Sequence, residues 1–236
     1  MKTFTKQLPQ LMLVCTAVII LASCASMAIA PSTSFNNAND VHNIKATVIL
    51  QDNSSMLGYL TLQNKSTQKA ASVRLPKERT TIDFHAHDIK AYEIEDTHYA
   101  LKLIKPNSQK IYVWGKPLPY KSFVKRLTPQ QYEIQLYSYE EKVAEQKSSL
   151  TKNITHYFIE FTQTEPEVLI DVTHPKFLAQ FQQQITKMQQ QCFALNEKIN
   201  TNEQAYTITN KKKNAKERSS ILYNIAKLYN ECSSTK

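Results

Sequence analysis

The sequence predicts an α+β protein: an antiparallel β-rich body, either a sandwich or an open barrel, followed by a C-terminal helical unit. Between Asn43 and Asp171 polar and apolar residues mostly alternate, which is the pattern of half-buried strands. These short strands follow one another with turns and no helical pattern between them, which is typical of antiparallel meanders. From Thr173 onward the apolar spacing changes to that of amphipathic helices.

The β-rich body, predicted over residues 43–172, begins with a hairpin. Residues 44–50 and 56–62 alternate on either side of a polar turn at 51–55. Further strands are predicted at 72–75, 81–84, 89–94, 99–103, 110–114, 122–127, 132–139, 156–161 and 168–172. Residues 143–153 are polar and predict a loop.

The helical unit is predicted over residues 173–236. Thr173 is a suitable N-cap and Pro175 suits the first turn. The apolar residues that follow at helical spacing are Phe177, Leu178, Phe181, Ile185 and Met188. Two more helical segments are predicted at 193–199, with Phe193, Leu195 and Ile199 as its apolar residues, and at 215–231.

The N-terminus has the layout of a secretory signal peptide. Lys2 and Lys6 precede an apolar run at residues 11–22, and small residues follow it. A helix that crosses the hydrocarbon core needs about 20 apolar residues, so this run is too short to span a membrane. Residues 1–23 are therefore predicted to be removed.

The end of the apolar run carries a second indication. The residues Leu21-Ala22-Ser23-Cys24 resemble the lipobox of bacterial lipoproteins. This resemblance implies that Cys24 receives a diacylglyceryl group and, after cleavage, a further acyl chain, which attaches the protein to the lipid bilayer. It also implies the outer membrane, because Ala25 rather than Asp follows the cysteine. The alternative is cleavage near Ala28-Ile29-Ala30, which would release a soluble periplasmic binding protein.

Composition narrows the function classes. Residues 24–42 are small and polar, and predict a flexible tether. Two glycines in 236 residues argue against phosphate-binding glycine loops and dinucleotide-binding folds. Loss of Lys2 and Lys6 lowers the formal charge from +9 to +7, but the lysines are scattered apart from the basic run at 211–218. Such a run is more often a solvated helix start or loop than a binding site. An envelope address argues against nucleic acid as a partner, and the alternative for this run is contact with anionic lipid or with lipopolysaccharide phosphates.

Two cysteines remain in the mature chain, Cys192 and Cys232, since Cys15 leaves with the signal peptide and Cys24 carries lipid. In an oxidising envelope compartment they are a natural disulfide pair. Free buried thiols are the alternative.

Two groups of residues show a second resemblance. Ile82-Asp83-Phe84 and residues 88–92 (D-I-K-A-Y) lie after a hairpin, and residues 228–232 (L-Y-N-E-C) close the chain with Cys192 upstream. Together they resemble a family of uncharacterised envelope proteins of Bacteroidota. The resemblance implies a β-rich body, C-terminal helices and the cysteine pair, and it implies no activity.

Candidate site residues are few. His85 and His87 are spaced to point the same way from a strand, where they could share a metal ion with His98 or Asp83 as a third ligand. The alternative is a pair of exposed histidines before a strand. The aromatic residues Tyr112, Trp114 and Tyr120 flank a proline-containing turn and form the best candidate for a binding surface.

The sequence therefore predicts a lipid-anchored envelope protein without enzymatic activity or cofactor. Its partner is expected to be an unknown envelope protein or glycan. A metal-dependent envelope enzyme that uses His85 and His87 is the alternative.

Overall fold

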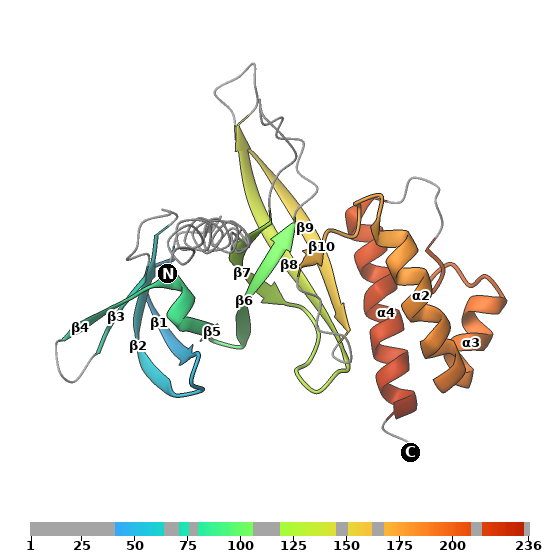
Figure 1. Cartoon of the computed structure of the whole chain (residues 1–236), viewed down its shortest axis with the longest axis horizontal. Coiled ribbons are helices and arrows are strands. Elements are labelled where there is room, and N and C mark those ends of the chain that lie inside the picture. The colour runs from blue at the N-terminus through green and yellow to red at the C-terminus, as the bar shows by residue number, and fades with distance from the viewer. Residues whose placement is uncertain are drawn as a thin grey trace, which may run out of the picture. The chain divides into compact units, whose positions relative to one another are not determined.

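The structure is a computed structural model that describes residues 41–63, 71–75, 80–105, 119–144, 151–161, 168–208 and 214–233. Within these ranges the chain forms a ten-stranded sheet, a short 3₁₀ helix and three α-helices, which come mostly at the C-terminal end (Figure 1). The predicted α+β class with an antiparallel β-rich body is confirmed. The predicted strand at 110–114 and the residues before Val41 lie outside the described ranges.

The strands follow the predicted order along the chain. They are β1 (Val41–Leu50), β2 (Ser55–Leu62), β3 (Ala71–Arg74), β4 (Thr81–Phe84), β5 (Ile89–Ile94), β6 (Thr97–Lys105), β7 (Tyr120–Arg126), β8 (Ile134–Ala144), β9 (Thr151–Phe161) and β10 (Leu169–Ile170). The 3₁₀ helix η1 (Ala86–Asp88) lies between β4 and β5.

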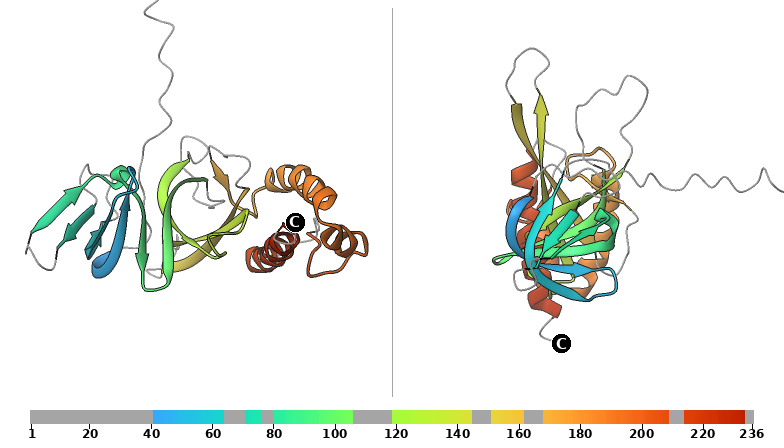
Figure 2. Two further views of the ribbon diagram at one scale, coloured as in Figure 1. Left: turned by 90° about the horizontal axis from the view of Figure 1, so that it is seen from below. Right: turned by 90° about the vertical axis from the view of Figure 1, so that its left-hand side faces the viewer.

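The sheet has the order β4-β3-β2-β1-β5-β6-β7-β8-β9, and neighbouring strands along this path are antiparallel. The short strand β10 pairs in parallel with the end of β6, through Leu169 opposite Ile104. The next residues of the same segment reach β9, where Asp171 forms a bridge with Phe158. The strands β6 to β9 therefore curve toward a common segment (Figure 2), although the ten-stranded sheet as a whole stays open.

The first part of β8, residues 134–137, is buried on both faces of the sheet, to which successive side chains point in turn. Tyr137 and Tyr139 pack on the concave side, in a cluster with Ile104, Val124, Phe158 and Leu169. Ile134 and Leu136 face the other way and join the helices in a second cluster. A third cluster, which includes Val48, Leu60, Ile89, Tyr92 and Phe123, is built mainly from β1, β2, β3 and β5.

The helices are α2 (Phe177–Gln191), α3 (Phe193–Asn200) and α4 (Ala215–Ser233). Helix α2 buries Phe177, Phe181, Ile185 and Met188, which are among the residues whose spacing predicted it. Helix α4 buries an apolar stripe of Ile221, Leu222, Ile225, Ala226 and Tyr229 in the same cluster as the outer face of β8 and β9. Among the described residues, none of the helices has the length and apolar content needed to cross a bilayer.

Three local predictions were wrong. The predicted loop at 143–153 is shorter, because β8 continues to Ala144, which pairs with Thr151 of β9; residues 145–150 lie outside the described ranges. Thr173 does not cap α2, which begins at Phe177; its amide and hydroxyl donate to Asp171 instead. Phe193 is 80% exposed, since the short helix α3 buries only Leu195. In the first case strand pairing overrode the polar pattern, and in the second a local hydrogen-bonded turn from Asp171 to Thr173 replaced the cap.

We expect Gly58→Ala to destabilise the sheet. Gly58 lies in the buried part of β2, and a Cβ there would stand 2.5 Å from Val73 Cγ1 and 3.0 Å from the Arg74 carbonyl oxygen. Overpacking of this kind costs about 1–3 kcal/mol, measurable as the free energy of unfolding in denaturant. The same substitution in a Val73→Ala background should cost less, because part of the clash is removed. An equal cost in both backgrounds would contradict this explanation.

Candidate functional site

The proposed metal ligands His85 and His87 do not lie on a strand. Strand β4 ends at Phe84, and both histidines belong to the turn around η1. The Asp88 carboxylate accepts a hydrogen bond from the His85 amide at 2.9 Å, which fixes this turn. The expectation that alternation on a strand aligns the two rings was therefore wrong. Within the described ranges, no three His, Cys, Asp or Glu residues are arranged to hold a metal ion.

The proposed third ligands His98 and Asp83 lie on strands. His98 lies on β6, where its Nδ1 is 3.0 Å from Glu93 Oε1 of β5, directly opposite in the sheet. Asp83 lies on β4 opposite Ser72 of β3. Each of these two residues therefore lies opposite a residue of the neighbouring strand.

The aromatic surface is described only at Tyr120, since Tyr112 and Trp114 lie outside the described ranges. Tyr120 is half-buried and meets the Tyr139 ring edge-on, with 6.3 Å between the ring centres. Its hydroxyl donates toward the Tyr139 hydroxyl at 3.4 Å. Tyr120 therefore packs against the concave side of the sheet.

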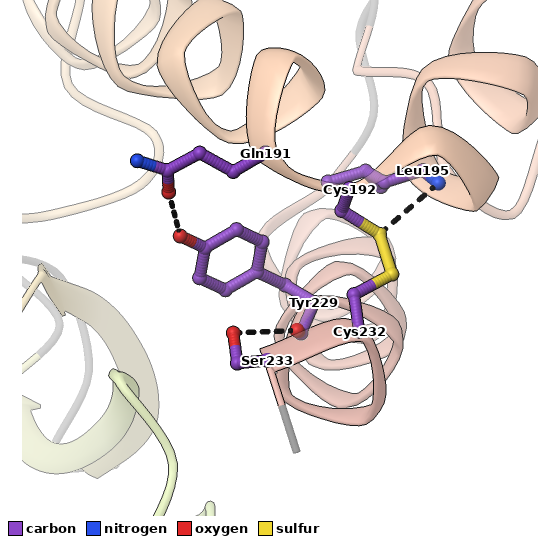
Figure 3. Close-up of a disulfide and its surroundings, with 6 residues drawn as sticks. All are labelled: Gln191, Cys192, Leu195, Tyr229, Cys232 and Ser233. Atoms are coloured by element: carbon purple, nitrogen blue, oxygen red, sulfur yellow. Dashed lines mark hydrogen bonds between the residues drawn. A yellow bond between two sulfur atoms is a disulfide. The ribbon is translucent and has the colours of Figure 1, made fainter. Parts of the chain in front are cut away.

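Cys192 and Cys232 lie at disulfide distance, with their Cα atoms 5.6 Å apart (Figure 3). This arrangement is compatible with the predicted disulfide bond. Cys192 joins α2 to α3, and its sulfur also accepts a hydrogen bond from the Leu195 amide. One turn before Cys232, the Tyr229 hydroxyl donates to the Gln191 side chain, so the end of α4 is tied to the end of α2 at two points. Cys24 lies outside the described ranges.

A buried ionic cluster was missed by the sequence analysis. His156 of β9 lies between two carboxylates: its Nδ1 is 2.5 Å from Asp171 Oδ2, and its Nε2 is 3.2 Å from Glu141 Oε2 of β8. All three residues are almost fully buried, with His156 at 3%, Asp171 at 1% and Glu141 at 5% exposure. The Tyr139 ring lies beside the imidazole, at 6.3 Å between ring centres.

Hydrogen bonds stabilise the negative charge of Asp171 as well. Its second oxygen, Oδ1, accepts from the Thr173 amide at 2.7 Å and from the Thr173 hydroxyl at 2.6 Å. Burial lowers the pKa of His156, but the hydrogen bonds and charges of Asp171 and Glu141 outweigh it and raise that pKa to about 9. The ring is therefore an imidazolium at neutral pH, and both of its N–H groups donate to carboxylates.

This geometry fits a structural role for His156. A general base needs a free ring nitrogen within reach of a substrate proton. Both nitrogens of His156 are engaged and the ring is buried. The sequence contains one signal for this cluster. Residues two apart on a strand point to the same side of the sheet, so the charged Glu141 is expected on the same side as Tyr137 and Tyr139. The partner Asp171, however, follows from the fold alone.

A groove of about 430 Å³ lies between the outer face of the sheet and α4. Its floor follows the strand register: Lys125 of β7 pairs with Ser138 of β8, which pairs with Tyr157 of β9. Leu127, Leu136, Glu140 and Thr155 complete the floor. Its wall consists of Lys216, Ser219, Ser220, Tyr223 and Asn224, which repeat at helical spacing along one face of α4.

Comparisons with known proteins give no match: no family model, no curated protein and no solved structure is similar to this chain.

We expect Cys232→Ala to lower the free energy of unfolding under oxidising conditions. In the chain-entropy model, a bridge that closes a loop of 40 residues contributes about 3–4 kcal/mol. Cys232 is the better position to change, because Cys192 also accepts the Leu195 hydrogen bond. Denaturant unfolding with and without a reducing agent measures the effect: reduction should destabilise the wild type and leave the variant unchanged. A wild type that is insensitive to reduction would contradict the bridge.

We expect stability to fall as the pH rises through about 9. The pKa of His156 is raised from about 6.5 to about 9 on folding, so the protonated ring stabilises the fold fully below pH 6.5. This contribution, on the order of 3 kcal/mol, is lost as the folded protein titrates near pH 9. Denaturant unfolding between pH 6 and 10 measures this dependence. The His42→Gln variant, which changes an exposed histidine, is the control and should show the same pH dependence of unfolding as the wild type.

The titration itself can be observed without a variant. In a two-dimensional NMR titration of the histidine rings, one imidazole should remain protonated to about pH 9. If every histidine of the folded protein titrates at or below pH 6.5, the ionic cluster does not exist in the form described.

Proposed function

We propose that this chain is a lipid-anchored lipoprotein of the bacterial cell envelope whose folded part is a non-enzymatic binding or structural module. The lipobox resemblance at Leu21-Ala22-Ser23-Cys24 carries this proposal. Acylated Cys24 would be the link to the bilayer, and residues 25–40 would join the anchor to β1. Three acyl chains on one cysteine exceed the single chain that gives only marginal, reversible membrane binding. Ala25 favours the outer membrane.

The cysteine pair supports an envelope address. Disulfides persist in oxidising compartments such as the bacterial periplasm and are rare in the reducing cytosol. Cys192, between α2 and α3, and Cys232 of α4 lie at disulfide distance.

The buried cluster supports a non-enzymatic module. The pKa of its histidine is raised, and such perturbed groups often mark catalytic sites. Here the perturbing carboxylates also occupy both ring nitrogens, so the arrangement is that of a structural ion cluster. The groove beside α4 is accessible instead, and its residues suit binding.

The intact mass of the protein extracted from bacterial membranes tests the anchor. The wild type is expected to give the mass of residues 24–236 plus three acyl chains. Cys24→Ser should give a chain without lipid that still carries the signal peptide. Cys15→Ser is the matched control, because it changes the other cysteine of the signal peptide and should be lipidated like the wild type.

A wild-type mass that begins near Pro31 and includes no lipid would overturn the proposal. The protein would then be a soluble periplasmic one, cut after Ala28-Ile29-Ala30.

A further inference from the structure

The groove between α4 and the sheet is unusual for such an interface because polar and charged side chains share its lining with apolar ones. Helix–sheet contacts normally bury apolar side chains on both sides. Helix α4 does this with its stripe around Ile221, Leu222 and Ile225, which packs in the cluster that contains Leu136 and Ile159. Beside this stripe the helix presents Lys216, Ser220, Tyr223 and Asn224 to the groove.

The polar groups in the groove have the character of a carbohydrate site. Ser138, Thr155 and Ser220 present hydroxyl groups from three different elements, and each can donate or accept a hydrogen bond. Asn224 donates to the Ala205 carbonyl oxygen at 3.2 Å, which holds this side chain in place. Tyr223 is 38% exposed, so its ring offers a flat apolar surface to the C–H groups of a sugar ring. A volume of about 430 Å³ lies within the range of small-molecule sites.

The charges of the groove favour an anionic ligand. Lys125 and Lys216 approach it from the sheet and from the helix, and both are exposed. Among the described residues neither ammonium group has a hydrogen bond or an ion pair. Glu140 is the one carboxylate of the lining. Burial raises the pKa of the Tyr99 hydroxyl, and the charge of Glu140 raises it further.

We propose that this groove binds a saccharide that carries a carboxylate group. The two lysines would take the carboxylate, the hydroxyl groups would bond to the sugar hydroxyls, and Tyr223 would cover one face of a ring. The inference rests on the proposed function, because it names the ligand class of the binding module. A bilayer surface is the poorer occupant: Tyr223 is the one large exposed apolar side chain of the described residues that lines the groove, and membrane binding requires a broader apolar face.

Calorimetric titration of the chain extracted from membranes in neutral detergent tests this inference. The probe is tetragalacturonate, and its methyl ester is the matched ligand with the same rings and no charge. We expect saturable binding of the acid and at least tenfold weaker binding of the ester. Lys125→Gln and Lys216→Gln should each weaken binding of the acid about five- to tenfold, since each removes a charge-assisted hydrogen bond. Ser220→Trp should abolish it by filling the groove.

Lys227→Gln is the matched control variant. Lys227 is an exposed lysine of the same helix that is not part of the groove, so this change removes the same charge and should leave the affinity unaltered. Equal weakening by all three lysine variants would mean nonspecific charge attraction and would overturn the proposal. Tighter binding of glycerol 3-phosphate, the anionic part of a phospholipid headgroup, would overturn it in favour of a phosphate site.

The proposal of the lipid anchor and the proposal of the saccharide groove can be overturned independently. A chain without acyl groups overturns the anchor, whatever it binds. A chain that carries the acyl groups and shows no saturable binding of tetragalacturonate overturns the groove, and the anchor still stands.

Discussion

The contact between His156 and Asp171 is the constraint on which the arrangement of this protein depends. It joins β9 to the segment after β10, and Glu141 extends it to β8. Removing one partner of such a buried pair leaves an uncompensated charge and typically costs about 3–5 kcal/mol. The cluster also has a geometric consequence. Because both ring nitrogens need a carboxylate, few positions of Asp171 satisfy the buried imidazolium, and the segment after β10 is held in one place.

That segment connects the sheet to the helices. Asp171 orders Thr173 through two hydrogen bonds, and the Val172 amide donates to the Tyr157 carbonyl oxygen of β9. The Val172 carbonyl oxygen then accepts from the buried Arg218 guanidinium of α4 at 2.6 Å. Three consecutive residues therefore tie the concave side of the sheet, its outer face and α4 together. The groove depends on the same junction, since Ser219 and Ser220 follow Arg218 directly.

The proposed lipid anchor and the folded part depend on different features of the sequence. Lipidation at Cys24 would require only a local sequence that a modifying enzyme recognises, and it places no demand on the fold. The folded part has the opposite character. Its strands β8 and β9 contribute to the ionic cluster on one face and to the groove on the other, so a change in their register would disturb both. Function and stability are therefore linked through these two strands.

Most strands and helices could be predicted from the sequence, because the period of apolar residues distinguishes the two. The sequence also predicted the hairpin of β1 and β2, the apolar face of α2 and the pairing of Cys192 with Cys232, to which the structure adds a compatible geometry. The ionic cluster and the groove could not be predicted in this way. Asp171 is 15 residues from His156, and Lys216 is 91 residues from Lys125. No local pattern relates such residues, since their proximity results from sheet curvature and helix packing, which depend on contacts along the whole chain.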